Sequence, residues 1–148
     1  MLTKPRSGWA EITIGDWSER LSYLDDVAFM LLDAMLRSCK EHQPASVRFD
    51  AEGYEYIIIF DWECSYVIEL KDEQRLIMLD VPRDKIAMEL ANDISKNAKA
   101  WASFVDYGDM SGFEKGYREL DLLSKCNELI GLLPSDNWTV VYQKKDET

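Results

Sequence analysis

Two pairs of carboxylates are the residues of this sequence that come closest to a chemical motif. Asp50 and Glu52 form the first pair, and Asp61 and Glu63 form the second. Carboxylates at such spacing can act as a general acid and base or bind a divalent cation such as magnesium. Residues two apart face the same way only within a strand, and we place the first pair in a turn and the second across one. The spacing alone therefore identifies no catalytic or metal-binding site.

The other residue types used in catalysis form no recognisable motif. The single histidine, His42, follows a predicted helix, where an imidazole can interact with the negative end of the helix dipole. Cys39, Cys64 and Cys126 lie far apart and are odd in number, which predicts free, structural thiols. The glycines form neither a phosphate-binding loop nor a nucleophile elbow. We therefore expect no cofactor, no bound metal and no enzymatic activity.

Negative charge is concentrated in one part of the chain. The sequence has 28 acidic residues against 17 lysines and arginines, a net charge of −11. Between Asp50 and Glu73 there are eight acidic residues and a single base, Lys71, so this segment carries −7 of that charge. Solvated sheet edges account for part of it, but soluble surfaces usually mix both signs. The segment therefore indicates a surface that binds a basic partner.

The predicted partner-binding residues are the carboxylates of this segment, two aromatic residues beside them and an acidic loop farther along the chain: Asp50, Glu52, Tyr54, Glu55, Asp61, Trp62, Glu63, Asp106 and Asp109. The two aromatic residues are included because amphipathic rings often anchor protein interfaces. The same negative charge disfavours nucleic acid and anionic membranes as direct partners. The oligomeric state does not follow from these features.

Length and composition describe one globular domain. With 148 residues, of which 47% are hydrophobic, the chain is long enough to bury a single core without metals or disulfides. We expect one domain over residues 1–148, with an ordered core from about 8 to 143. No stretch approaches the roughly 20 apolar residues of a membrane helix, and the beginning of the chain does not resemble a signal peptide. We therefore expect a cytoplasmic protein.

The hydrophobic pattern predicts an α+β fold with an antiparallel sheet of about six strands, arranged as a hairpin and a meander, and three helices mainly on one face. The hairpin is expected around Gly15 and Asp16, which separate two alternating runs. The meander strands are expected in "SVRF", "YEYIIIFDW", "SYVIEL" and "QRLIML". The second of these has apolar residues on both faces and is therefore predicted to be central. A final strand is expected in "WTVVYQ".

The three helices are predicted over residues 26–42, 82–105 and 111–133. Asp25 or Asp26 can cap the first helix with its side chain. Ser111 and Glu114 have the spacing of a capping box at the start of the third. The apolar stripe of the third helix is predicted to contain Phe113, Tyr117, Leu120, Leu123, Ile130 and Leu133.

A small, acidic α+β domain without an active-site signature resembles the immunity proteins that bacteria make against polymorphic or contact-delivered toxins. The stretches "GWAEITIGDW" and "FDAEGYEYIII" look like this class in style, and the resemblance covers Trp9 to Leu133. It implies a non-enzymatic protein that neutralises a cognate toxin, often a basic nuclease, and it assigns no site residue. Two alternatives stay open: a small metal-dependent hydrolase or ligand-binding enzyme that uses the acidic cluster, and a structural subunit of a larger assembly.

Overall fold

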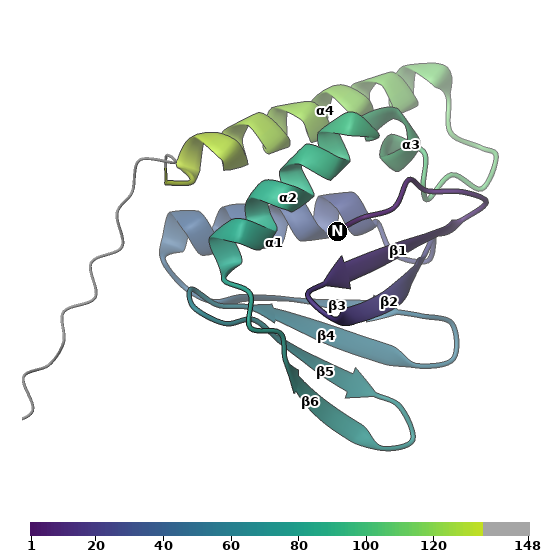
Figure 1. Cartoon of the computed structure of the whole chain (residues 1–148). Coiled ribbons are helices and arrows are strands. Elements are labelled where there is room, and N and C mark those ends of the chain that lie inside the picture. Colours follow the sequence, from purple (N-terminus) through teal and green to yellow (C-terminus); the bar gives the residue numbers. More distant parts are fainter. Residues whose placement is uncertain (135–148) are drawn as a thin grey trace, which may run out of the picture.

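The computed structural model describes residues 1–134, and the elements within them confirm an α+β fold (Figure 1). In chain order these elements are β1 (Trp9–Ile14), β2 (Trp17–Ser22), α1 (Val27–Glu41), β3 (Ala45–Asp50), β4 (Glu55–Phe60), β5 (Tyr66–Leu70), β6 (Gln74–Met78), α2 (Arg83–Lys96), α3 (Ala98–Ala102) and α4 (Gly112–Leu132). The strand predicted in "WTVVYQ" and the end of the predicted ordered core lie outside the described residues.

The strands form two antiparallel sheets. β1 and β2 pair as a hairpin around Gly15, whose φ of +59° suits a tight turn. The other four strands form a sheet in the order β3-β4-β5-β6. In that sheet β4 is an inner strand, as predicted, and Ile58 lies opposite Val47 on one side and Val67 on the other. The hairpin-plus-meander arrangement is therefore confirmed, with the hairpin as a sheet of its own.

The elements stack in three layers (Figure 1). Helices α2, α3 and α4 form one outer layer, α1 and the hairpin form the middle layer, and β3–β6 form the other outer layer. The face of the four-stranded sheet that points into the molecule carries Tyr56, Ile58 and Phe60, all fully buried. In the part of the chain that the structure describes, no helix or strand covers the opposite face.

Residues 1–134 contain four helices where the sequence predicted three. The helix predicted after Pro82 is divided into α2 and α3, because Asn97 leaves helical geometry at φ −120°. Asp26 is the N-cap residue of α1, but its side chain makes no capping hydrogen bond. At the start of α4 the Ser111 hydroxyl accepts a hydrogen bond from the Glu114 N–H at 3.1 Å, so this part of the predicted capping box is confirmed.

The apolar stripe predicted for α4 is wrong in its first half. Phe113, Tyr117 and Leu120 are 86%, 67% and 68% exposed. A different row of residues on this helix is fully buried, namely Leu122, Cys126 and Leu129. Both rows have helical spacing, so the period was predicted correctly and the direction of the helix face was not.

Arg118 lies on the same buried side of α4 as Leu122, Cys126 and Leu129 and makes polar contacts there. Its Nη2 donates to both carboxylate oxygens of Asp26 at 2.9 Å, and its Nε donates to the Ala102 carbonyl at 2.8 Å. Because these partners belong to the start of α1 and the end of α3, the side of α4 that carries Arg118 must face them. The side that carries Phe113 and Tyr117 is then turned to solvent.

A matched pair of substitutions tests this orientation of α4. Leu122→Ala is expected to lower the free energy of unfolding by about 2–5 kcal/mol, because it leaves a cavity at a fully buried position. Leu120→Ala makes the same chemical change on the exposed side of α4 and is expected to cost less than about 0.5 kcal/mol. Urea denaturation followed by circular dichroism measures both. Equal losses for the two variants would contradict the helix orientation described above.

Candidate functional site

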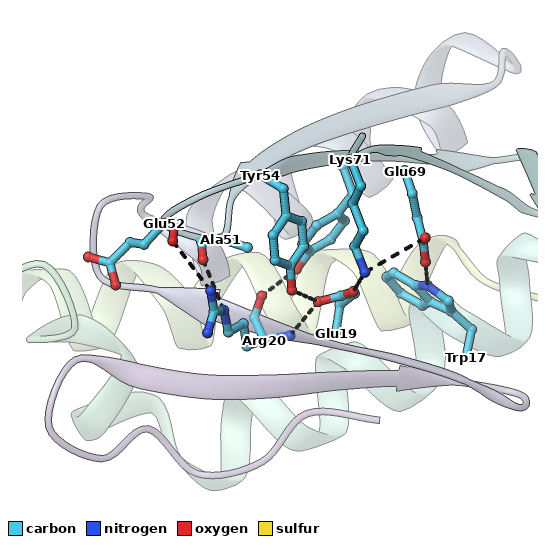
Figure 2. A network of polar contacts seen from close by, with 9 residues as sticks. Trp17, Glu19, Arg20, Ala51, Glu52, Tyr54, Glu69 and Lys71 are labelled. Atoms are coloured by element: carbon cyan, nitrogen blue, oxygen red, sulfur yellow. Dashed lines mark hydrogen bonds and ion pairs between the residues drawn. The ribbon is translucent and has the colours of Figure 1, made fainter. Parts of the chain in front are cut away.

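A network of polar contacts joins the hairpin to the four-stranded sheet (Figure 2). The Glu19 carboxylate on β2 accepts hydrogen bonds from the Tyr54 hydroxyl and from Lys71 Nζ, the latter at 2.8 Å. Lys71 Nζ also lies 3.7 Å from one carboxylate oxygen of Glu69. The other Glu69 oxygen accepts a hydrogen bond from the indole N–H of Trp17 at 3.3 Å. These contacts fix the hairpin over β4 and β5.

Arg20 holds the hairpin against the turn between β3 and β4. Its Nε donates to the Ala51 carbonyl at 2.9 Å, and its Nη2 donates to the Glu52 carbonyl at 3.3 Å (Figure 2). The guanidinium carbon also lies 5.4 Å from the ring centroid of Tyr54 and 5.3 Å from that of Trp9, within the range of a cation–π contact. A base from β2 therefore supports the acidic turn.

The network shifts the pKa values of its members. Burial acts to raise the pKa of Glu19, but hydrogen bonds from Lys71 and Tyr54 oppose it, and the net pKa lies below the ordinary value. Burial and the hydrogen bond to Glu19 raise the pKa of Tyr54. The hydrogen bond to Glu19 raises the pKa of Lys71. All three shifts strengthen the protonation states found at neutral pH, which suits a structural tether better than a general acid or base.

The predicted site residues occupy three separate places. Asp50, Glu52, Tyr54 and Glu55 surround the turn between β3 and β4; Asp61, Trp62 and Glu63 follow the other end of β4; Asp106 and Asp109 lie between α3 and α4. The six residues of β4 separate the first two groups by about 20 Å at the usual rise of a strand. The structure therefore does not bring the two carboxylate pairs together.

Bases from outside the acidic segment compensate part of its charge. Arg48 on β3 forms an ion pair with Glu55 on β4, and its hydrogen bond lowers the pKa of Glu55. Arg20 lies against the same turn. Both arginines precede Asp50 in the sequence, so the count over the segment did not include them. In residues 1–134, the exposed carboxylate of Glu52 has no ion-pair partner.

Asp106 organises its own loop. Its carboxylate accepts hydrogen bonds from Lys115, from the Met110 N–H at 3.0 Å and from the Gly108 N–H at 2.8 Å. These bonds lower the pKa of Asp106 to about 2. The carboxylate is thus committed to contacts within the loop, whereas Asp109 in the same loop is exposed.

The outer face of the four-stranded sheet is an apolar surface that the sequence analysis did not single out. One set of side chains on β4, β5 and β6 points away from the core, namely Ile57, Ile59, Tyr66, Ile68, Leu70, Leu76 and Met78. We call these seven residues the outer sheet face. Leu76 and Met78 are 68% and 66% exposed, and the other five are partly buried. The signal for this surface was the run of isoleucines in β4, which fills both faces of the strand.

Carboxylates lie at both ends of the outer sheet face. Glu55 points to the same side of β4 as Ile57 and Ile59. At the other end, a shallow cavity of about 310 Å³ is lined by Asp61, Trp62, Glu63, Cys64 and Tyr66. Tyr66 belongs to the outer sheet face, so the acidic loop after β4 adjoins the apolar surface. The arrangement is an apolar centre with Glu55, paired with Arg48, at one end and the acidic loop after β4 at the other.

Three further observations bear on function. Within residues 1–134, no three histidine, cysteine, aspartate or glutamate side chains are grouped so that they could hold a metal ion. None of the helices described in Figure 1 is both long and apolar enough to cross a membrane. The chain matches no protein family, no curated protein and no solved structure.

The contact between Glu19 and Lys71 gives a pH-dependent prediction. Glu19→Gln is expected to lower the free energy of unfolding at pH 7 by on the order of 1 kcal/mol, because a neutral amide makes a weaker hydrogen bond to Lys71. The folded pKa of Glu19 lies below its ordinary value of 4.5. Its charged form therefore adds stability above that value and loses it as the pH falls through the folded pKa. Urea denaturation at several pH values should show the difference between wild type and variant shrinking below about pH 4.5.

Glu11→Gln is the control, because Glu11 is an exposed carboxylate on the same hairpin. It is expected to change stability little at any pH. A Glu19→Gln effect that persists unchanged in acid would contradict the role given to the Glu19 charge.

Proposed function

We propose that this protein is a non-enzymatic binding protein that neutralises a basic protein, such as a cognate toxin, by docking it on the outer sheet face. The observation that most supports this is the exposed apolar centre of that face between two groups of carboxylates. Protein interfaces commonly combine a fully buried apolar core with a polar rim. The outer sheet face has both parts on one surface.

The apolar residues of this face account for the affinity that a neutralising protein needs. Leu76 and Met78 expose about two thirds of their surface, and exposed apolar patches rimmed by polar groups mark interaction sites. Tyr66 adds an amphipathic ring next to the acidic loop. A partner that covered these side chains would remove them from water together.

The charge distribution favours a basic partner over an acidic one. The chain carries a net charge of −11, and Glu52, Asp61 and Glu63 have no ion-pair partner in residues 1–134. Such charges steer an oppositely charged protein toward the surface and raise the association rate, especially at low salt. A basic nuclease presents cationic side chains that bind phosphate, and these carboxylates can form ion pairs with them. Neutralisation then needs only that the partner's substrate surface is covered.

Co-expression with the products of the flanking genes tests this function. Each product is induced alone and together with this protein, and growth of the host is measured. One product is expected to be toxic and to be neutralised. The variant Leu76→Arg with Met78→Arg should lose this protection and weaken binding at least about 100-fold, because it places charge in the apolar centre.

Leu120→Arg is the matched control, because Leu120 has the same 68% exposure as Leu76 but lies on α4. It is expected to retain protection. Loss of protection with Leu120→Arg alone would move the interface to α4 and contradict the proposal. Failure to find any neutralised product among the flanking genes would also contradict it.

A second prediction concerns the carboxylates at the ends of the outer sheet face. The triple variant Glu52→Gln, Asp61→Asn and Glu63→Gln should keep the thermal stability of the wild type, because carboxylates that are exposed or partly exposed and make no ion pair in residues 1–134 contribute little to folding. Its association with the toxic product should slow by about tenfold at low salt and lose most of its salt dependence. Stopped-flow association at several salt concentrations measures both quantities. An unchanged rate at low salt would show that the steering charges lie elsewhere.

A further inference from the structure

β6 presents an unpaired strand edge. It is the last strand of the sheet, and in residues 1–134 its backbone makes no hydrogen bond other than those of its ladder with β5. Just beyond β6, the Leu79 N–H donates to the Ser65 carbonyl on the β5 side at 2.9 Å. Hydrogen-bonded and non-hydrogen-bonded pairs alternate along an antiparallel ladder. The N–H and C=O groups of Leu76 and Met78 therefore point away from β5.

A cavity of about 450 Å³ lies beside this edge, between β6 and the hairpin turn. The charged and aromatic side chains that line it are Asp16, Trp17, Glu69, Arg75 and Asp80, together with apolar residues such as Ile77. Three carboxylates face one guanidinium group in this set. The cavity is therefore suited to a cationic group.

Glu69 is the most buried of the three carboxylates that line this cavity. It is 6% exposed and points to the inner face of the sheet. Its Oε1 accepts the hydrogen bond from Trp17, but within residues 1–134 its Oε2 accepts none. The nearest cation, Lys71 Nζ, lies 3.7 Å from Oε2 and is hydrogen-bonded to Glu19 at 2.8 Å. Oε2 therefore has an ion-pair partner but no donor at hydrogen-bond distance, and an added donor would strengthen its contacts.

We propose that the basic partner adds a β-strand to the free edge of β6 and places a lysine or arginine in the cavity, within reach of Glu69. This inference rests on the proposed function and states how the partner is held. Side chains of a strand alternate between its two faces, so one added strand meets both surfaces. Its apolar side chains lie beside Leu76 and Met78, and its basic side chain enters the cavity. Main-chain hydrogen bonds supply affinity, and the alternate side chains supply specificity.

Short peptides test this arrangement on the full chain. One nine-residue peptide alternates valine with lysine, and a second has glutamate in place of lysine. The lysine peptide is expected to bind at least about tenfold more tightly. In its complex, amide hydrogen exchange measured by NMR should slow at Leu76 and Met78, whose N–H groups face the free edge. The lysine peptide with N-methylated valines cannot pair with β6 through those amides and should not bind.

Glu69→Gln isolates the charge in the cavity, because glutamine still offers an oxygen to the Trp17 indole. It is expected to reduce the preference for the lysine peptide to that set by the overall charge of the protein. The control is Glu73→Gln, which removes one charge from the exposed turn before β6 and should retain the preference. Equal preferences in the two variants would overturn the pairing with Glu69.

Other results would overturn strand addition itself. These are tight binding of the N-methylated peptide, or fast exchange at Leu76 and Met78 in the complex. Slow exchange at both amides in the free protein would show that the edge is already taken. If the double variant Val140→Asp, Val141→Asp restores fast exchange at these amides, the occupant is residues 138–143 of the same chain. If dilution of the protein restores fast exchange, the occupant is a second copy.

The two proposals fail separately. A flanking-gene product that is neutralised while both amides stay fast would leave the proposed function standing and remove strand addition. Slow exchange at both amides in the complex with the lysine peptide, without any neutralised gene product, would support strand addition and contradict the proposed function.

Discussion

The attachment of the hairpin to the four-stranded sheet is the interaction on which the rest of the structure depends. A two-stranded hairpin is marginally stable alone, and β1 and β2 share no backbone ladder with β3–β6. Side-chain contacts replace that ladder. Glu19 binds Lys71, and Trp17 packs edge-on against Tyr56 with ring centroids 5.4 Å apart. Because the hairpin lies over β4 and β5 on the inner face, those strands are buried on that side. Beside β6, the space next to the hairpin turn remains open as the cavity at Glu69.

The same arrangement leaves an apolar sheet face and a free strand edge at the surface, which in most proteins favours aggregation. Several features oppose unspecific pairing here. β6 has only five residues, Asp72 and Glu73 lie in the turn before it, and Arg75 is exposed along it. Like charges also keep copies of an acidic chain apart. The short length of β6 limits pairing with any strand, and Asp72 and Glu73 discriminate against acidic strands without repelling a basic one. Protection against self-association and selection of a basic partner therefore have a common electrostatic origin.

Local patterns in the sequence were sufficient to predict the six strands of residues 1–134, the hairpin and the inner position of β4. They were not sufficient where a contact joins distant segments. The buried side of α4 contains a contact between Arg118 and Asp26, 92 residues earlier, and periodicity alone cannot choose between two apolar rows on one helix. Glu69 could have been recognised as an inward residue, because it lies two residues after the buried Val67 in β5 and therefore points to the same face. Its partner Trp17, 52 residues away, could not. The charge of −7 counted over the acidic segment is correct, but the count could not include Arg48, which pairs with Glu55 from outside the segment.

The carboxylates of the sequence identified the ends of the proposed interface but not its centre. The free energies of ion pairs and of apolar burial explain why. An exposed ion pair typically contributes about 0.2–1 kcal/mol, whereas full burial of a leucine or methionine side chain contributes about 1.5–3 kcal/mol. Leu76 and Met78 therefore outweigh several rim carboxylates in affinity, even though charge dominates the composition. The carboxylates act over longer distances and so govern encounter. Glu69 differs from the rest, because a carboxylate that is 6% exposed interacts more strongly with a cation than one in water does. Within an acidic protein, burial thus separates the charge suited to attracting a partner from the charge suited to holding it.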